Sequence, residues 1–190
     1  MSALRVCPIP GNEPERLLAL RSYQVLDTAP ELEFDALARI AAYTYGTPIA
    51  LVAMMDADRL WFKSRIGLDV PQLDRRIAFC AHSIMAPQQA LVVEDLSTDD
   101  RFHDNPLVAQ APHLRLYAAA PVVDALGNAL GTIAVIDARP RHFTDQERAV
   151  LRDLESDVMT TLEGRRRALD LALLATTDHL TRIGNRAKFE

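Results

Sequence analysis

Cysteine, glycine and aromatic residues are scarce in this 190-residue chain, which has two cysteines, seven glycines and 6% aromatic residues. Two cysteines, Cys7 and Cys80, cannot build a disulfide framework, and neither belongs to the Cys-x-x-Cys pairs that bind zinc. We therefore expect no metal site. The length fits one domain with an attached element, and 49% hydrophobic with 25% charged residues is typical of a globular protein.

Long apolar runs and an excess of basic residues are also missing. No apolar run approaches the roughly 18 residues of a membrane-spanning helix, and the N-terminus MSALRVCPIPGNE lacks the apolar segment of a signal peptide. The net charge is −5, and the one basic run, Arg165–Arg167, is short. Because phosphate contacts need clustered Lys and Arg, this argues against nucleic-acid binding. We expect a cytoplasmic protein without nucleic-acid or membrane partners.

Two helices are predicted near the start of the chain. Asn12 with Glu15, and Thr28 with Glu31, have the three-residue spacing of a helix capping box, and Pro30 would lie in the first turn of the second helix. The second helix has its apolar residues on one face, at steps of three and four.

Two hairpins and a long helix follow. Segments 48–56 and 59–67 are predicted to form the first hairpin, with one wetter face on its second strand, and segments 114–124 and 129–138 the second. The stretch 68–113 between them is irregular, with a short helix in AFCAHSIM and a short strand in ALVVED. Together these elements predict an α+β (α/β) fold, an antiparallel sheet flanked by helices.

The last predicted helix begins with a third capping box, Thr144 with Glu147, and runs to about Thr177. It would be about 51 Å long at 1.5 Å per residue. Gly164 interrupts it and is a candidate soft point, since glycine is unfavourable within helices. Apolar residues recur along it at the three- and four-residue steps of a coiled-coil seam, predicting a parallel homodimer through this helix. These residues are Leu151, Leu154, Val158, Leu162 and Leu169. Up to about residue 158 the same apolar face could instead pack on the chain's own sheet, so the second half of the helix carries the dimer prediction.

The order of several short motifs resembles the GAF family, above all the GAF domains that precede histidine kinases and GGDEF-type diguanylate cyclases in bacteria. The motifs are ALRSYQVLDTAPE, LWFKSRIGL, FCAHSI, DLSTDDRFHDNPLV, LRLYAAAPV and LGTIAVIDARPRHFT. The resemblance implies a PAS-like antiparallel sheet. It also implies a flexible tail at 1–12, a GAF domain at 13–143, a signalling helix at 144–177 and a truncated output domain at 178–190.

The final segment, DHLTRIGNRAKFE, is similar to the opening turn of a GGDEF domain. The matching residues are Asp178, Leu180, Thr181, Asn185 and Arg186. No two of the seven glycines are adjacent, so the Gly-Gly of the GGDEF catalytic loop is missing from this chain. The resemblance therefore implies a sensory domain of a diguanylate cyclase that is not itself an enzyme. GTP and Mg²⁺ would be needed only by the missing domain.

The resemblance also implies a pocket for a small-molecule effector on one face of the sheet. The residues expected around it are Trp61, Lys63, Phe79, Cys80, His82, Arg115 and Tyr117. Lys63 and Arg115 would favour an anionic ligand, although either could instead pair with Asp95 or Asp137. Because Cys80 and His82 are two residues apart on a predicted helix, they point to different sides and do not chelate one ion.

Two alternatives remain open at this point. The domain could be a ligand-free dimerisation module. It could also be a GAF-fold free methionine sulfoxide reductase, which needs an attacking thiolate and a resolving cysteine within reach. We expect Cys80 to be buried and inert, since it lies between Phe79 and Ala81 in an apolar stretch, and Cys7 lies in the tail. Cyclic nucleotide binding is disfavoured because the Asn-Lys dipeptide of such GAF domains is missing.

Overall fold

A computed structural model describes residues 7–176 of the chain. The residues that resemble the opening turn of a GGDEF domain, Asp178, Leu180, Thr181, Asn185 and Arg186, lie outside this range. The helices are α1 (Glu13–Ser22), α2 (Leu32–Tyr45), the 3-10 helix η1 (Arg75–Ile77), α3 (Cys80–Ser83), α4 (Pro106–Ala109) and α5 (Asp145–Thr176). The strands are β1 (Ile49–Met55), β2 (Arg59–Ile66), β3 (Gln72–Asp74), β4 (Leu91–Val93), β5 (Leu116–Val123) and β6 (Ala129–Asp137).

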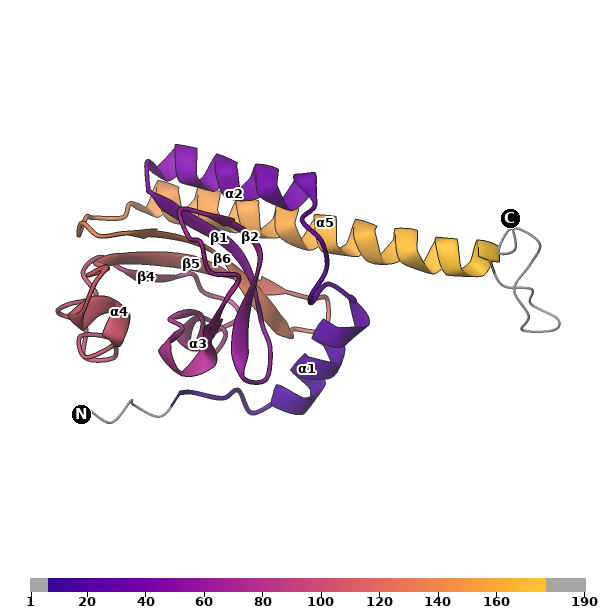
Figure 1. The fold of residues 1–190 in the computed structure, drawn as a ribbon, viewed down its shortest axis with the longest axis horizontal. Coiled ribbons are helices and arrows are strands. Elements are labelled where there is room, and N and C mark those ends of the chain that lie inside the picture. Colours follow the sequence, from indigo (N-terminus) through magenta and orange to yellow (C-terminus); the bar gives the residue numbers. More distant parts are fainter. Residues whose placement is uncertain (1–6, 177–190) are drawn as a thin grey trace.

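The six strands form one antiparallel sheet in the order β3-β2-β1-β6-β5-β4. The hairpins β1–β2 and β5–β6 are joined through the central pair β1–β6, which confirms the predicted fold class. Helices α2 and α5 lie side by side on one face of the sheet, and α3 and α4 lie on the other (Figure 1). Within the described residues no helix combines the length and the apolar character needed to cross a membrane.

The core consists of two apolar clusters, one on each face of the sheet. Strand β1 contributes to both because its side chains alternate between faces: Val52 and Met54 point toward α2 and α5, whereas Leu51 and Ala53 point toward α3. All seven residues of β1 are buried, as its continuous apolar sequence predicts. In β2 the predicted wetter face is wrong, because five consecutive residues from Leu60 are buried.

Only one of the three predicted capping boxes forms. At α5 the backbone N–H of Glu147 donates to Thr144 Oγ1 at 3.2 Å, and the N–H of Thr144 donates to Glu147 Oε2 at 2.8 Å. Asn12 precedes α1 without a side-chain capping bond. Helix α2 begins only at Leu32, and Thr28 donates its hydroxyl to the carbonyl of Val25 at 2.7 Å. The predicted Thr28–Glu31 box is therefore wrong.

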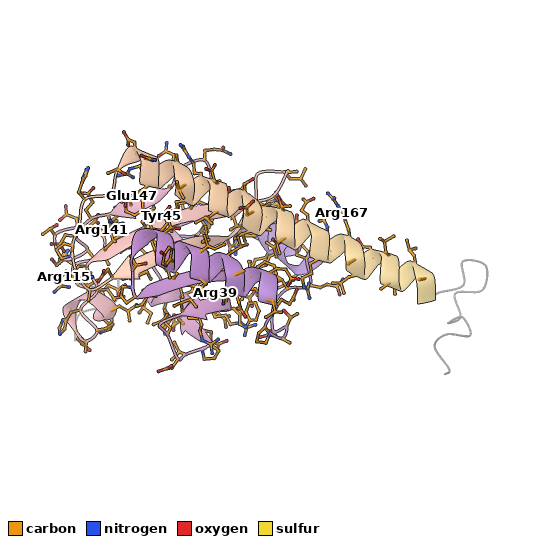
Figure 2. All side chains as sticks on the ribbon, turned by 90° about the horizontal axis from the view of Figure 1, so that it is seen from above. Arg39, Tyr45, Arg115, Arg141, Glu147 and Arg167 are labelled. Atoms are coloured by element: carbon orange, nitrogen blue, oxygen red, sulfur yellow. The ribbon has the colours of Figure 1, made fainter. Side chains whose placement is uncertain are left out.

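The predicted coiled-coil seam is wrong for the first half of α5. Four of its five residues are buried against this chain's own sheet and α2, so they are not available to a second chain. These are Leu151, Leu154, Val158 and Leu162. Leu169 is 38% exposed, and beyond it α5 projects away from the sheet (Figures 1 and 2). Helix α5 thus has a packed half and a projecting half.

Candidate functional site

The seven predicted pocket residues lie on both faces of the sheet. Trp61 and Lys63 are two residues apart on β2 and share the face covered by α2. Phe79, Cys80 and Tyr117 belong to the cluster on the opposite face. The prediction of one pocket joining Trp61 to Tyr117 is therefore wrong.

The two remaining predicted pocket residues, His82 and Arg115, make contacts of their own. His82 packs edge-on against Phe102, with ring centroids 4.8 Å apart. Arg115 lies near the end of the molecule opposite the projecting helix (Figure 2), and its Nη1 donates to the carbonyls of Val108 and Leu114 at 3.1 and 2.9 Å. Arg115 thus pairs with carbonyls and not with the carboxylate of Asp95 or Asp137.

A cavity of about 240 Å³ does lie beside the start of α3, on the face that holds Tyr117. Its lining comes from the central strands, from the segment 68–80 and from the α4 region, and none of the lining residues is charged. The lining residues are Ile49, Leu51, Leu60, Leu68, Val70, Leu73, Ala78, Phe79, Cys80, Leu107, Pro112, Leu114, Tyr117 and Ile136. Such a site suits a small apolar molecule, and it offers no counter-charge to the anionic ligand that Lys63 and Arg115 predicted.

Polar atoms next to this cavity are paired with one another. The Tyr117 hydroxyl lies 2.8 Å from Ser83 Oγ, and Cys80 Sγ accepts hydrogen bonds from Tyr117 at 3.3 Å and Thr132 at 3.1 Å. Burial raises the pKa of the Cys80 thiol, which opposes formation of the nucleophilic thiolate. The predicted burial of Cys80 is confirmed. Among the described residues, no group of three or more His, Cys, Asp and Glu side chains could hold a metal ion.

Lys63, by contrast, is the centre of a buried polar cluster on the helix face. Its side chain is fully buried, and Nζ donates to Thr28 Oγ1 and the carbonyl of Ala29 at 2.8 Å each and to Glu31 Oε1 at 2.6 Å. The same ammonium lies 5.3 Å from the ring centroid of Phe34. All three hydrogens of the ammonium therefore have acceptors in this one cluster.

Glu31 joins this cluster to the end of the packed half of α5. Arg165 Nε donates to Glu31 Oε1 at 2.8 Å, and Arg165 Nη1 donates to the carbonyl of Tyr23 at 2.9 Å. Burial opposes ionisation of Glu31, but hydrogen bonds from Lys63 and Arg165 outweigh it and lower its pKa. We call Lys63, Glu31 and Arg165 the exit cluster, since α5 leaves the domain at this point.

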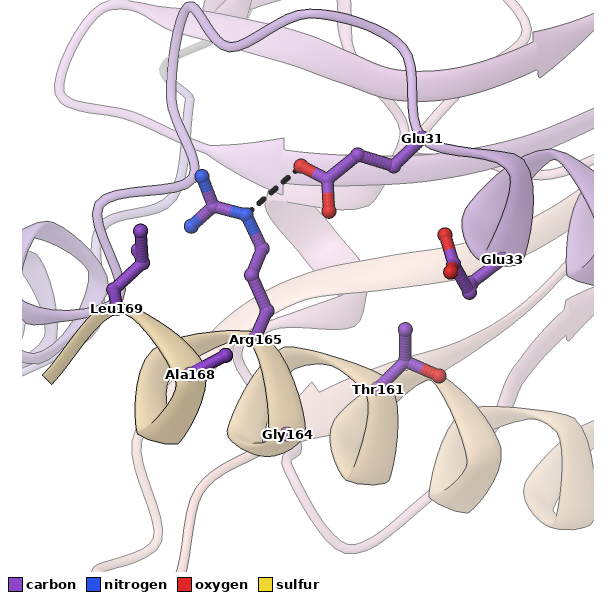
Figure 3. A pocket seen from close by; sticks show the side chains of 7 residues that line it. All are labelled: Glu31, Glu33, Thr161, Gly164, Arg165, Ala168 and Leu169. Carbon is purple, nitrogen blue, oxygen red and sulfur yellow. Dashed lines mark hydrogen bonds and ion pairs between the residues drawn. The ribbon is translucent and has the colours of Figure 1, made fainter. Parts of the chain in front are cut away.

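An open groove of about 680 Å³ lies beside the exit cluster, between the start of α2 and α5 (Figure 3). It is lined by Glu31, Glu33, Thr161, Gly164, Arg165, Ala168 and Leu169. In Figure 3 the guanidinium of Arg165 reaches across from α5 to the carboxylate of Glu31, while Glu33 lies farther along α2. Sequence reasoning missed the exit cluster because its members are far apart in the chain.

Comparison with known proteins places these features in a family. The sequence pattern described as "GAF domain" matches residues 29–162. The chain belongs to the GAF family. The match extends from the residues before α2 through the packed half of α5, so this half of the helix is part of the GAF domain.

A curated relative from Pseudomonas aeruginosa, named a cyclic di-GMP phosphodiesterase, is 38% identical over 134 residues. The alignment covers 70% of this chain but 23% of the relative, so this GAF domain spans less than a quarter of that protein.

Solved structures agree on the fold. A free methionine-R-sulfoxide reductase from Neisseria meningitidis has a TM-score of 0.59 at 16% identity, covering 88% of this chain and 99% of that one. The GAF domain of an Acinetobacter phosphoenolpyruvate-protein phosphotransferase has a TM-score of 0.57 at 15% identity, covering 82% and 98%. At these identities the likeness establishes the fold alone.

Proposed function

We propose that this GAF domain is a sensory module that controls an enzyme of cyclic di-GMP turnover through α5. Family membership supports a regulatory role, and the name of the Pseudomonas aeruginosa relative supports the link to cyclic di-GMP. The resemblance of residues 178–190 to the opening of a GGDEF domain favours synthesis from GTP as the controlled reaction. The relative's name instead points to hydrolysis, and both reactions need an output domain beyond the GAF domain.

The exit cluster is the observation that carries this proposal. Strand β2 contributes Leu60 to the wall of the apolar cavity and Lys63 to the exit cluster on the opposite face. A small apolar effector that displaces β2 would therefore move the ammonium that holds Glu31. Because Glu31 also holds Arg165 at 2.8 Å, this displacement would change how the projecting half of α5 is oriented. Ligand binding and output would then be coupled through one carboxylate.

The full-length gene product provides the test. Replacing Arg165 with methionine should change its rate of cyclic di-GMP synthesis or hydrolysis by at least about fivefold, the lower range of typical allosteric coupling. The matched control is Arg167→Met, because the Arg167 side chain is 74% exposed and pairs with Glu163, one turn away on the same helix, at 2.9 Å. The isolated chain should neither make nor hydrolyse cyclic di-GMP. Equal rates for both variants and the parent, or turnover by the isolated chain, would refute the proposal.

A second candidate function, a homodimerisation module, is favoured by the projecting half of α5. Leu171, Leu173 and Leu174 are 66%, 66% and 52% exposed there, although leucine side chains are usually buried in globular proteins. We propose that this half pairs in parallel with α5 of a second copy, which would cover Leu171 and Leu174, three residues apart on one face of the helix. This proposal does not exclude the first, because paired helices would transmit a change at the exit cluster to two output domains.

Sedimentation of the purified chain tests the dimer. The parent protein should be dimeric at micromolar concentrations, and Leu171→Glu with Leu174→Glu should make it monomeric without changing its thermal stability. Leu126→Glu is the matched control, because Leu126 is 88% exposed in the β5–β6 turn and should leave the dimer intact. A monomeric parent protein at high micromolar concentration would contradict the dimer.

The reductase alternative is disfavoured by the surroundings of Cys80. Cys80 is 2% exposed and burial raises the pKa of its thiol, whereas an attacking cysteine needs access and an easily formed thiolate.

A further inference from the structure

Helix α2 has apolar residues on its outward side as well as on the side that packs on the sheet. Leu32, Ile40 and Tyr43 are 82%, 49% and 90% exposed, and together with Ala36 they recur at steps of four and three residues. Residues at these steps lie on one side of a helix. A surface helix needs only one apolar face to pack on its own domain. The outward side of α2 thus offers a second apolar face to another molecule.

The side of α5 next to it carries small residues and leads to the exposed leucines. Gly164 and Ala168 line the groove between the two helices, and Leu171, 66% exposed, follows three residues later. Figure 2 looks down on α2 and α5, which lie side by side. Small side chains allow a second helix to approach closely. We call the outward side of α2 and the adjoining side of α5, from Asp153 to Leu171, the outer face.

Three exposed charged residues lie on the outer face. They are Arg39 on α2, at the steps of Ala36 and Tyr43, and Asp153 and Asp157 on α5. Within residues 7–176 their side chains make no hydrogen bond or ion pair, although opposite charges are present on neighbouring helices. These charges are therefore available to another molecule.

The three charged residues lie at the same height along the two helices. Helices α2 and α5 run antiparallel, because the Tyr45 hydroxyl donates to the carbonyl of Glu147 at 2.8 Å at one end and the exit cluster joins them at the other. Six residues back from Tyr45 along α2 is Arg39. Six residues forward from Glu147 along α5 is Asp153. Counting eight residues along each helix from the exit cluster pairs Arg39 with Asp157 instead, so Arg39 lies level with both carboxylates.

A second copy of the chain matches this pattern. A two-fold axis parallel to the helices keeps each residue at its height and brings α2 of one copy over α5 of the other. Arg39 of each copy then faces Asp153 and Asp157 of the other, and the apolar side of α2 meets the small residues of α5. The α5 helices of the two copies also run in the same direction, as pairing of their projecting halves requires.

The area of the outer face is also sufficient for a stable dimer. Helices of 14 and 32 residues present about 70 Å of helix at 1.5 Å per residue. At a width of about 10 Å they offer roughly 700 Å² per copy, near the roughly 800 Å² that each partner of a stable complex buries.

We propose that a second copy docks on the outer face, so that α2 and α5 of the two copies form a four-helix bundle with Arg39 opposite Asp153 and Asp157. This inference rests on the proposed dimer and extends it from the projecting half of α5 onto the GAF domain itself. The groove beside the exit cluster belongs to the outer face. A change at the exit cluster of one copy would therefore alter its contacts with the other.

Two charge-reversed variants of the whole chain, studied by sedimentation, test the bundle. Arg39→Glu, and separately Asp153→Arg with Asp157→Arg, should each raise the dimer dissociation constant at least about tenfold, because like charges replace opposite charges at two symmetric contacts. An equal mixture of the two variant proteins should form a heterodimer about as tight as the parent dimer. In the mixed dimer, reversed charges face reversed charges and unreversed charges face unreversed ones, so both contacts again join opposite signs.

The outcomes separate this interface from the dimer on which it rests. If the parent is dimeric but the two variants dimerise as tightly, or if their mixture is no tighter than either variant alone, the four-helix interface is overturned and the dimer through the projecting half of α5 stands. A monomeric parent protein overturns both.

The apolar part of the outer face has a test of its own. Ile40→Glu with Tyr43→Glu should make the protein monomeric at micromolar concentrations, since charged side chains would then be buried against the second copy. Leu18→Glu is the matched control, because Leu18 is 67% exposed on α1, away from the outer face (Figure 1), and should leave the dimer intact. A double variant that dimerises like the parent would overturn the interface. If the double variant does not fold, the mixture of the charge-reversed proteins decides.

Discussion

Replacing Gly131 with alanine should destabilise the domain by at least about 3 kcal/mol, the upper range for overpacking a core. Gly131 lies on β6 and pairs with Met54 of β1 at the centre of the sheet. A Cβ atom there would lie 1.9 Å from the carbonyl oxygen of Ala53 and 2.9 Å from the Cα of Met54. Both obstacles are backbone atoms of a strand that is buried along its whole length, so they cannot rotate away as a flexible side chain would.

Gly164→Ala provides the matched control, because it adds the same methyl group in open space. Apart from the adjacent residues and the backbone of α5 itself, no described atom lies within 4 Å of the new Cβ, and Gly164 is exposed within α5. Alanine is favoured over glycine in a helix by about 1 kcal/mol, so this variant should be slightly more stable than the parent protein. Denaturant unfolding of both variants, followed by circular dichroism, measures the difference. A Gly131→Ala variant as stable as the parent would mean that β1 and β6 can separate enough to admit a methyl group.

The strands could be predicted from sequence where the apolar pattern was long enough. Four of the six, β1, β2, β5 and β6, each have seven or more residues, and their predicted ranges contain the observed ones. Strand β3 was missed because it has three residues with one apolar side chain and pairs only with the start of β2. Helix α4 was missed because its four residues begin within the polar stretch LSTDDRFHDNPLV, which predicts a loop. The short elements α3 and β4 do lie within the predicted segments AFCAHSIM and ALVVED. Strand β3 and helix α4 depend instead on contacts with distant segments, which local periodicity cannot indicate.

The capping boxes show how a distant partner can override a local signal. Thr144 and Glu147 cap α5 as predicted, and Glu147 also pairs with Arg141 only six residues away. Thr28 and Glu31 have the same spacing, yet both are hydrogen-bonded to Lys63, more than thirty residues away. Because the buried ammonium of Lys63 needs these acceptors, they do not cap a helix, and α2 starts later. The sequence near Thr28 does not show that Lys63 will compete for them.

The face of the sheet on which each side chain lies was the least predictable part of the site. The alternation within β2 correctly places Trp61 and Lys63 together, but it does not specify whether that face meets the helices or the cavity. Only the pairing of all six strands shows that Tyr117 points the other way. The packing partner of the apolar face of α5 was ambiguous too. Apolar residues at steps of three and four can pack against the chain's own sheet as well as against a second helix.

Replacing Glu31 with alanine should cost about 3 kcal/mol of unfolding free energy, the magnitude expected when a buried ion pair loses one partner. Lys63 has no exposed side-chain surface, so its amino group would be left in the interior with only the acceptors of Thr28 and Ala29. Glu33→Ala is the control, because Glu33 lines the same groove but is exposed, and it should change stability by less than about 0.5 kcal/mol.

Removing both charges tests the cause of that loss. The double variant Glu31→Ala with Lys63→Met leaves no buried ammonium without a counter-charge, and should therefore recover most of the stability lost in Glu31→Ala. Arg165 keeps its bond to the carbonyl of Tyr23 in both variants. Its contribution to the unfolding free energy therefore cancels when Glu31→Ala is compared with the double variant. Urea unfolding of the parent protein, both single variants and the double variant gives the coupling energy between the two side chains. A coupling near zero would mean that Glu31 does not hold Lys63, and that the proposed path from β2 to α5 does not run through this carboxylate.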